Sequence, residues 1–122
     1  MDGTMVVQRP GFTPWVLSLD DGRTFVVQSR TVVIGRRPES DDLGVQKLTI
    51  NDDGRTISKT HARLDLVDGT WNVTDMGSTN GVVTTDAAGE EVDVQPGTPA
   101  AVHGRLVLGA VGMRLTPGGE PA

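Results

Sequence analysis

The segment ARLDLVDGTWNVTD (residues 62–75) decides the fold class of this chain. Apolar residues stand at alternate positions in its first half, at Ala62, Leu64 and Leu66, as in a strand with one buried face. Trp71 and Val73 repeat this alternation in the second half. Between the halves, Asp68-Gly69 supplies the positive φ angles that tight hairpin turns need. The segment therefore predicts a two-stranded antiparallel β-hairpin.

Short β-like segments bounded by turn residues continue on both sides of this hairpin. We expect strands at residues 15–19, 24–27, 31–35 and 47–50 before it, and at 82–85, 106–108 and 111–115 after it. The longest stretch without Gly or Pro, residues 55–68, alternates with period two in its second half, so no window predicts an amphipathic helix. Short strands with frequent turns are typical of an all-β sandwich or barrel.

The length of 122 residues is that of one domain, and 36% hydrophobic residues suffice for a core with many turns. We expect the ordered domain at residues 15–115, a flexible arm at 1–14, and a flexible Pro/Gly-rich tail or linker at 116–122. The chain has no Cys, which excludes disulfides, thiolate metal sites and cysteine nucleophiles. With only His61 and His103 besides, we expect no metal site and no cofactor.

The formal net charge of −5 does not favour nucleic acid as a partner. No apolar run approaches the ~18–20 residues that span a bilayer, so we expect no direct membrane insertion. A cytoplasmic location is expected, either for a separate domain or for the cytoplasmic part of a larger protein. Six of the eleven basic residues nevertheless fall within residues 36–63. This clustering is either ordinary scatter or a small anion site on an acidic body.

Three polar clusters stand at the ends of expected strands. They are Gly35-Arg36, the segment 58–61 (SKTH) and the segment 78–81 (STNG). Together they offer a guanidinium, an ammonium, hydroxyls and an amide, which is a donor set suited to an anion. Ser58 and His61, three residues apart on a loop, do not establish the geometry of a nucleophile and its base. We therefore expect a binding module and not an enzyme.

The order and separation of Gly35-Arg36, Ser58-x-x-His61 and Asn80-Gly81 make the chain resemble the forkhead-associated (FHA) domain. The surrounding text VVIGRRP, ISKTHARL and WNVTDMGSTNGV fits as well, and the resemblance covers about residues 15–115. It implies an antiparallel β-sandwich of about eleven short strands. It also implies recognition of phosphothreonine in a partner protein, downstream of a Ser/Thr protein kinase, without catalysis.

The resemblance also implies roles for particular residues. Arg36 matches a residue that contacts the phosphate and the peptide, and Ser58 matches one whose hydroxyl donates to the phosphate. Lys59 and Thr79 occupy positions that also reach the phosphate. Asn80 matches a residue that pairs with the peptide backbone. Residues expected to shape the loops without touching ligand are Gly35, His61 and Gly81.

Two departures and one alternative remain open at this stage. The segments 51–57 and 38–46 are longer than usual in such domains, and we expect both to lengthen loops near the site. Arg37 and Arg55 either contact a ligand side chain or face water. The alternative function is a phosphate-independent protein-interaction scaffold with the same fold.

Overall fold

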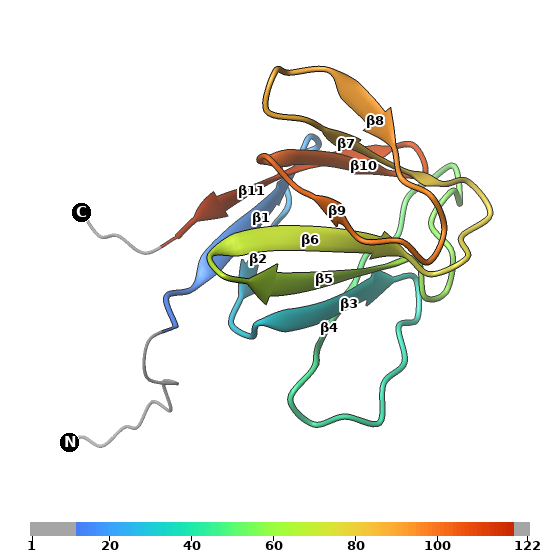
Figure 1. Ribbon diagram of the computed structural model, residues 1–122. Coiled ribbons are helices and arrows are strands. Elements are labelled where there is room, and N and C mark those ends of the chain that lie inside the picture. Colours follow the sequence, from blue (N-terminus) through green and yellow to red (C-terminus); the bar gives the residue numbers. More distant parts are fainter. Residues whose placement is uncertain (1–11, 119–122) are drawn as a thin grey trace.

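The computed structural model describes residues 12–118, which form a two-layered β-sandwich (Figure 1). The six-stranded sheet has the order β2-β1-β11-β10-β7-β8, with β1 at Trp15–Leu19, β2 at Thr24–Val27, β7 at Val82–Thr85, β8 at Glu91–Asp93, β10 at Arg105–Leu108 and β11 at Val111–Pro117. The five-stranded sheet has the order β4-β3-β5-β6-β9, with β3 at Thr31–Gly35, β4 at Gln46–Thr49, β5 at Ala62–Val67, β6 at Thr70–Asp75 and β9 at Ala100–Ala101. The expected eleven-stranded sandwich is confirmed. Residues 12–118 contain no helix that is long and apolar enough to cross a membrane.

The structure contains every expected strand, with ends shifted by at most two residues, and adds two that the pattern did not predict. These are β8, whose three residues are all exposed, and β9, which has only two residues. Neither has a buried apolar alternation to identify it. Strand β11 runs on to Pro117, so Thr116 and Pro117, expected in the tail, pair instead with β1. Of the expected arm and tail, residues 1–11 and 119–122 lie outside the described residues.

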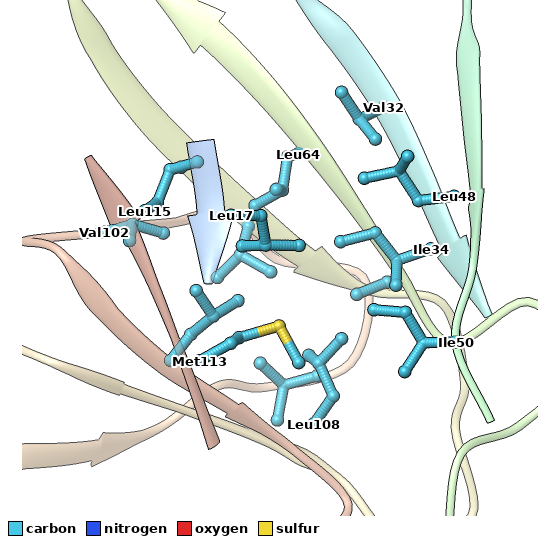
Figure 2. Close-up of a cluster of buried hydrophobic side chains, with 14 of the residues drawn as sticks. Leu17, Val32, Ile34, Leu48, Ile50, Leu64, Val102, Leu108, Met113 and Leu115 are labelled. Carbon is cyan, nitrogen blue, oxygen red and sulfur yellow. The ribbon is translucent and has the colours of Figure 1, made fainter. Parts of the chain in front are cut away.

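The β5–β6 hairpin supplies one wall of the core. Leu64 of β5 pairs with Val73 of β6, and both side chains are fully buried. The six-stranded sheet contributes the opposite wall, including Leu17, Leu108 and Met113 (Figure 2). Each buried Leu, Val or Met stabilises the fold by about 1.5–3 kcal/mol relative to exposure, so this cluster holds the two layers together.

Strand β3 lies inside its sheet and is almost entirely buried. Val32 and Ile34 point into the core, and Val33 on the outer face is only 5% exposed. Val33 stands between Lys47 of β4 and Arg63 of β5 in the register of the sheet, where the aliphatic stems of these long side chains can cover it. This placement explains why residues 32–34 form a continuous apolar run.

The pairing of β3 with β4 is parallel. This corrects the expectation of a sandwich in which all strands are antiparallel. A parallel neighbour requires the chain to return to the start of the strand, which the loop of residues 36–45 accomplishes. The Ser29 hydroxyl, just before β3, donates to the Gly44 carbonyl. The loop therefore ends beside the start of β3, at the end of the sandwich opposite Gly35. The long segment 38–46 therefore leads away from the expected site instead of enlarging it, and Gln46 itself belongs to β4.

Candidate functional site

The three polar clusters meet at one end of the sandwich. Strand β5 is antiparallel to both of its neighbours, with Ile34 opposite Ala62 and Ala62 opposite Asp75. The end of β3, the start of β5 and the end of β6 therefore lie at the same end of the sandwich. The described chain begins and ends near the opposite end (Figure 1). The loops at this end of the sandwich carry all five expected ligand-binding residues, which are Arg36, Ser58, Lys59, Thr79 and Asn80.

Gly35 and Arg36 pack directly against the loop that precedes β5. The backbone N–H of Arg36 donates to the Ser58 carbonyl at 2.9 Å, and that of Arg37 donates to the Lys59 carbonyl at 3.0 Å. A Cβ at position 35 would overlap the Lys59 carbonyl oxygen, so this close approach requires Gly. The side chain of Arg36 donates from Nε to the Ile57 carbonyl at 3.3 Å. Its two terminal nitrogens make none of the hydrogen bonds found within residues 12–118, and they remain as donors.

Ser58 and Thr79 lie 21 residues apart in sequence and are joined by a hydrogen bond. The Thr79 backbone N–H donates to the Ser58 hydroxyl oxygen at 3.1 Å. This contact orients the hydroxyl oxygen toward the second loop and leaves its proton to donate elsewhere. Asn80 donates from its side-chain amide to the Thr56 carbonyl at 3.1 Å, so its own carbonyl oxygen remains an acceptor. Lys59, Thr79 and Asn80 are exposed.

His61 is fully buried and links the loop that contains Ser58 to the loop that contains Gly81. Its Nδ1 accepts a hydrogen bond from the Ser58 backbone N–H at 3.0 Å. Because Nδ1 is an acceptor, the ring proton is on Nε2, which donates to the Gly81 carbonyl at 2.9 Å. Both ring nitrogens are thus engaged by backbone groups, and neither is available to remove a proton from the Ser58 hydroxyl.

The turn that presents Thr79 and Asn80 is fixed by its own side chains. The buried carboxylate of Asp75 accepts a hydrogen bond from the Ser78 backbone N–H at 2.8 Å. The Ser78 hydroxyl accepts one from the Gly81 backbone N–H at 3.0 Å. Gly81 has a φ of 83°, in the left-handed region that favours glycine. These contacts fix the path of the chain past Thr79 and Asn80 before any ligand is bound.

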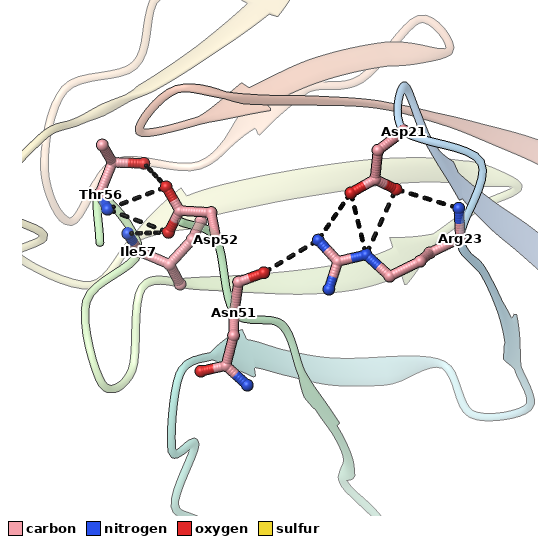
Figure 3. A network of polar contacts seen from close by, with 6 residues as sticks. All are labelled: Asp21, Arg23, Asn51, Asp52, Thr56 and Ile57. Carbon is pink, nitrogen blue, oxygen red and sulfur yellow. Dashed lines mark hydrogen bonds and ion pairs between the residues drawn. The ribbon is translucent and has the colours of Figure 1, made fainter. Parts of the chain in front are cut away.

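Asp52 and Thr56, which the sequence pattern did not single out, hold the loop that contacts Arg36 and Asn80. The Asp52 carboxylate accepts hydrogen bonds from the backbone N–H and hydroxyl of Thr56 and from the Ile57 backbone N–H (Figure 3). The Thr56 hydroxyl also accepts one from the Ala110 backbone N–H at 2.9 Å. The carbonyls of Thr56 and Ile57 are those that receive Asn80 and Arg36. An Asp four residues before a Thr in a loop was the available signal for this arrangement.

A second contact holds the start of the same loop. The Arg23 guanidinium donates to the Asn51 carbonyl at 2.9 Å and pairs with Asp21 at 2.8 Å (Figure 3). The hydrogen bond from Arg23 lowers the pKa of Asp21 below its ordinary value. The segment 51–57, expected as a longer loop near the site, does lie there, and it is anchored at both ends.

We predict that Asp52 makes the fold sensitive to acid. Burial acts to raise the pKa of Asp52, but the hydrogen bonds from Thr56 and Ile57 outweigh it and hold that pKa below its ordinary value. The ionised form therefore stabilises the fold above the unfolded-state pKa of about 4, and this contribution is lost as the pH falls through the lower folded-state pKa. In urea unfolding, Asp52→Asn should be less stable than the wild type at pH 7, with the difference shrinking below about pH 4.

Asp93→Asn is the matched control, because Asp93 is an exposed residue of β8, on a strand at the edge of the other sheet. We expect this variant to follow the wild-type curve across the same pH range. A constant difference between Asp52→Asn and the wild type at every pH would show that the loss comes from geometry and not from the charge of Asp52.

Comparison with protein families identifies the domain. The model of the FHA domain family matches residues 32–99, which is more than half of the chain and includes all three polar clusters. A comparison with curated proteins finds no match.

Solved structures of FHA domains share the fold at low sequence identity. The FHA domain of a hypothetical Arabidopsis thaliana protein has a TM-score of 0.65 and 19% identity, covering 98% of this chain and 98% of that chain. An FHA domain studied for phosphothreonine-dependent interactions has a TM-score of 0.56 and 21% identity, covering 90% and 100%. Mycobacterium tuberculosis EmbR, solved with a low-affinity phosphopeptide, has a TM-score of 0.62 and 16% identity, covering 89% of this chain and 26% of that one. By its match to the family model over residues 32–99, this chain belongs to the FHA domain family.

Proposed function

We propose that this FHA domain binds phosphothreonine in a partner protein that a Ser/Thr kinase has phosphorylated. Arg36, Ser58, Lys59 and Thr79 hold the phosphoryl group. Asn80 pairs with the peptide backbone beside it. Residues that keep the loops in place are Gly35, His61 and Gly81. The domain acts by binding and not by catalysis, as the family does.

The hydrogen bond between Ser58 and Thr79 is the observation that carries the proposal. It brings two loops together beside Arg36, whose terminal nitrogens form a donor fork that suits phosphate. The exposed ammonium of Lys59 adds a point charge on the same loop as Ser58. Asn80 keeps a carbonyl oxygen for a peptide N–H. These donors and the one acceptor are what an anionic group on an extended peptide needs.

Two structural neighbours support the choice of ligand. One is an FHA domain described for its phosphothreonine-dependent interactions, and another, EmbR, was solved with a phosphopeptide. The position of His61, with both ring nitrogens on backbone groups, supports binding over hydrolysis. The energetics are also suitable: charge-assisted hydrogen bonds contribute about 1.5–3 kcal/mol each, and after association entropy a net of about −8 kcal/mol corresponds to a micromolar Kd.

An oriented phosphothreonine peptide library tests the proposal, with the same peptides carrying Thr or phosphoserine alongside. We expect micromolar binding of phosphothreonine peptides only. The affinity should fall with added salt and below about pH 6, where the phosphate loses its second negative charge. Equal affinity for the unphosphorylated peptides would contradict the proposal and favour a phosphate-independent scaffold.

A further inference from the structure

Asn80 and Gly81 form a pair of residues with a chemistry of its own. Of the three asparagines in the chain, Asn80 alone precedes a glycine. Because glycine has no side chain, its backbone nitrogen can approach the amide carbon of the preceding asparagine more closely than that of any other residue. Asn80 is also exposed to water. The residue that we expect to pair with the peptide can therefore lose its side-chain amide without an enzyme.

The reaction is a deamidation with water as its only co-reactant. The Gly81 backbone nitrogen gives up its proton and attacks the Cγ atom of Asn80, and the new C–N bond closes a succinimide ring. The side-chain nitrogen Nδ2 takes up a proton and leaves as ammonia. Water then opens the ring at one of its two carbonyl carbons. The product has aspartate or isoaspartate at position 80.

In the folded domain, both nitrogens that take part are held by hydrogen bonds. The Gly81 backbone N–H, whose nitrogen would attack, donates to the Ser78 hydroxyl oxygen at 3.0 Å. The Nδ2 group of Asn80, which would leave, donates to the Thr56 carbonyl at 3.1 Å. Both contacts must break before the ring can close. The rate of reaction should therefore follow how often this turn opens.

Neither residue of the reactive pair can be replaced freely, so protection has to come from a neighbour. Gly81 has a φ of 83°, at which a residue with a Cβ is strained. Asn80 supplies the amide that joins this turn to the Thr56 carbonyl. Ser78 is well placed to protect them, because its own backbone N–H is fixed by the buried carboxylate of Asp75 at 2.8 Å.

We propose that Asn80 is a site of spontaneous deamidation that abolishes phosphopeptide binding, and that Ser78 sets its rate by holding the Gly81 N–H. A carboxylate at position 80 has no proton to donate to the Thr56 carbonyl, and it puts a negative charge next to Thr79. Isoaspartate also adds a methylene group to the main chain of the turn. The loss of binding, though not the reaction, rests on the function proposed above. Ser78 is a positioning residue.

The test compares the wild type with Ser78→Ala, Ser40→Ala and Asn80→Gln during incubation in mildly alkaline buffer. Mass spectrometry of the proteolytic peptide that contains residue 80 measures the replacement of NH2 by OH, and hydrogen exchange measures how often the Gly81 N–H opens. Ser40→Ala is the matched control, because the Ser40 hydroxyl likewise accepts a backbone N–H, that of Asp42 at 3.2 Å, in the loop of residues 36–45.

We expect Ser78→Ala to deamidate and to exchange the Gly81 N–H about 5-fold faster than the wild type, which corresponds to a hydrogen bond of about 1 kcal/mol. Ser40→Ala should match the wild type. Asn80→Gln should show almost no change in mass, because glutamine must close a larger ring. A saturating phosphothreonine peptide should slow the reaction in the wild type, since the open turn does not bind it, and the same peptide with Thr should not.

Asn80→Asp imitates the product and should bind phosphothreonine peptide at least about 10-fold more weakly, because like charges then face each other. Equal deamidation rates in Ser78→Ala and the wild type would overturn the inference. So would an equal acceleration of exchange at the β5 amides, because the whole domain would then be opening. Full-strength binding by Asn80→Asp would overturn the loss of binding. Absence of phospho-dependent binding by fresh wild type overturns the proposed function alone, because the mass measurement still decides the reaction at Asn80.

Discussion

Replacing Arg36 by Ala is expected to weaken phosphothreonine binding by about 100-fold or more. The substitution removes the terminal nitrogens that remain as donors beside Ser58, and two charge-assisted hydrogen bonds contribute at least about 3 kcal/mol. Each 1.4 kcal/mol changes Kd tenfold, so a micromolar complex moves to the limit of detection. Isothermal titration with one phosphothreonine peptide measures the change directly.

The fold should survive this substitution. The Arg36 side chain is exposed, and within residues 12–118 it makes one hydrogen bond, from Nε to the Ile57 carbonyl, whose loss costs about 1 kcal/mol. Thermal unfolding of Arg36→Ala should therefore be close to that of the wild type. Arg36→Lys, which keeps the charge but not the fork, should bind with an intermediate affinity. Undiminished binding by Arg36→Ala would place the phosphate elsewhere and contradict the proposed site.

Most strands of the fold could be predicted from local patterns in the sequence. The β5–β6 hairpin follows from alternation and an Asp-Gly turn, both of which act within a few residues. Strand β9 has two residues and β8 has no buried side chain, so each exists only because a neighbouring strand pairs with it. The parallel pairing of β3 and β4 is likewise a contact between distant segments, and no local pattern in residues 36–45 indicates it.

The site shows the same division between local and distant contacts. The spacing of the motifs predicted that Arg36, Ser58 and Asn80 lie on loops, and in the structure those loops meet at one end of the sandwich. The support from Asp52 was missed because its function depends on where Arg36 and Asn80 place their donors. Gly35 lay between these cases: the motif marked it, but only the Lys59 carbonyl beside it explains the requirement for glycine.

Gly35→Ala is expected to destabilise the domain by about 3 kcal/mol or more and to weaken phosphopeptide binding as well. The new methyl group would overlap the carbonyl oxygen of Lys59. A backbone atom cannot rotate aside as a side chain can, so β3 and the loop before β5 must move apart. That movement breaks the hydrogen bonds from the Arg36 and Arg37 N–H groups to Ser58 and Lys59, and it displaces Ser58 from Arg36.

Gly89→Ala is the matched control for this prediction. Gly89 has a φ of 88° in the turn between β7 and β8, and a Cβ there would meet nothing within 4 Å. This variant carries only the left-handed strain of about 1–2 kcal/mol and should bind phosphopeptide normally. Urea unfolding and peptide titration of both variants, with binding measured where each is folded, separate packing from strain. Equal stability losses, with binding intact in both, would show that the contact between β3 and the Lys59 loop does not hold the site together.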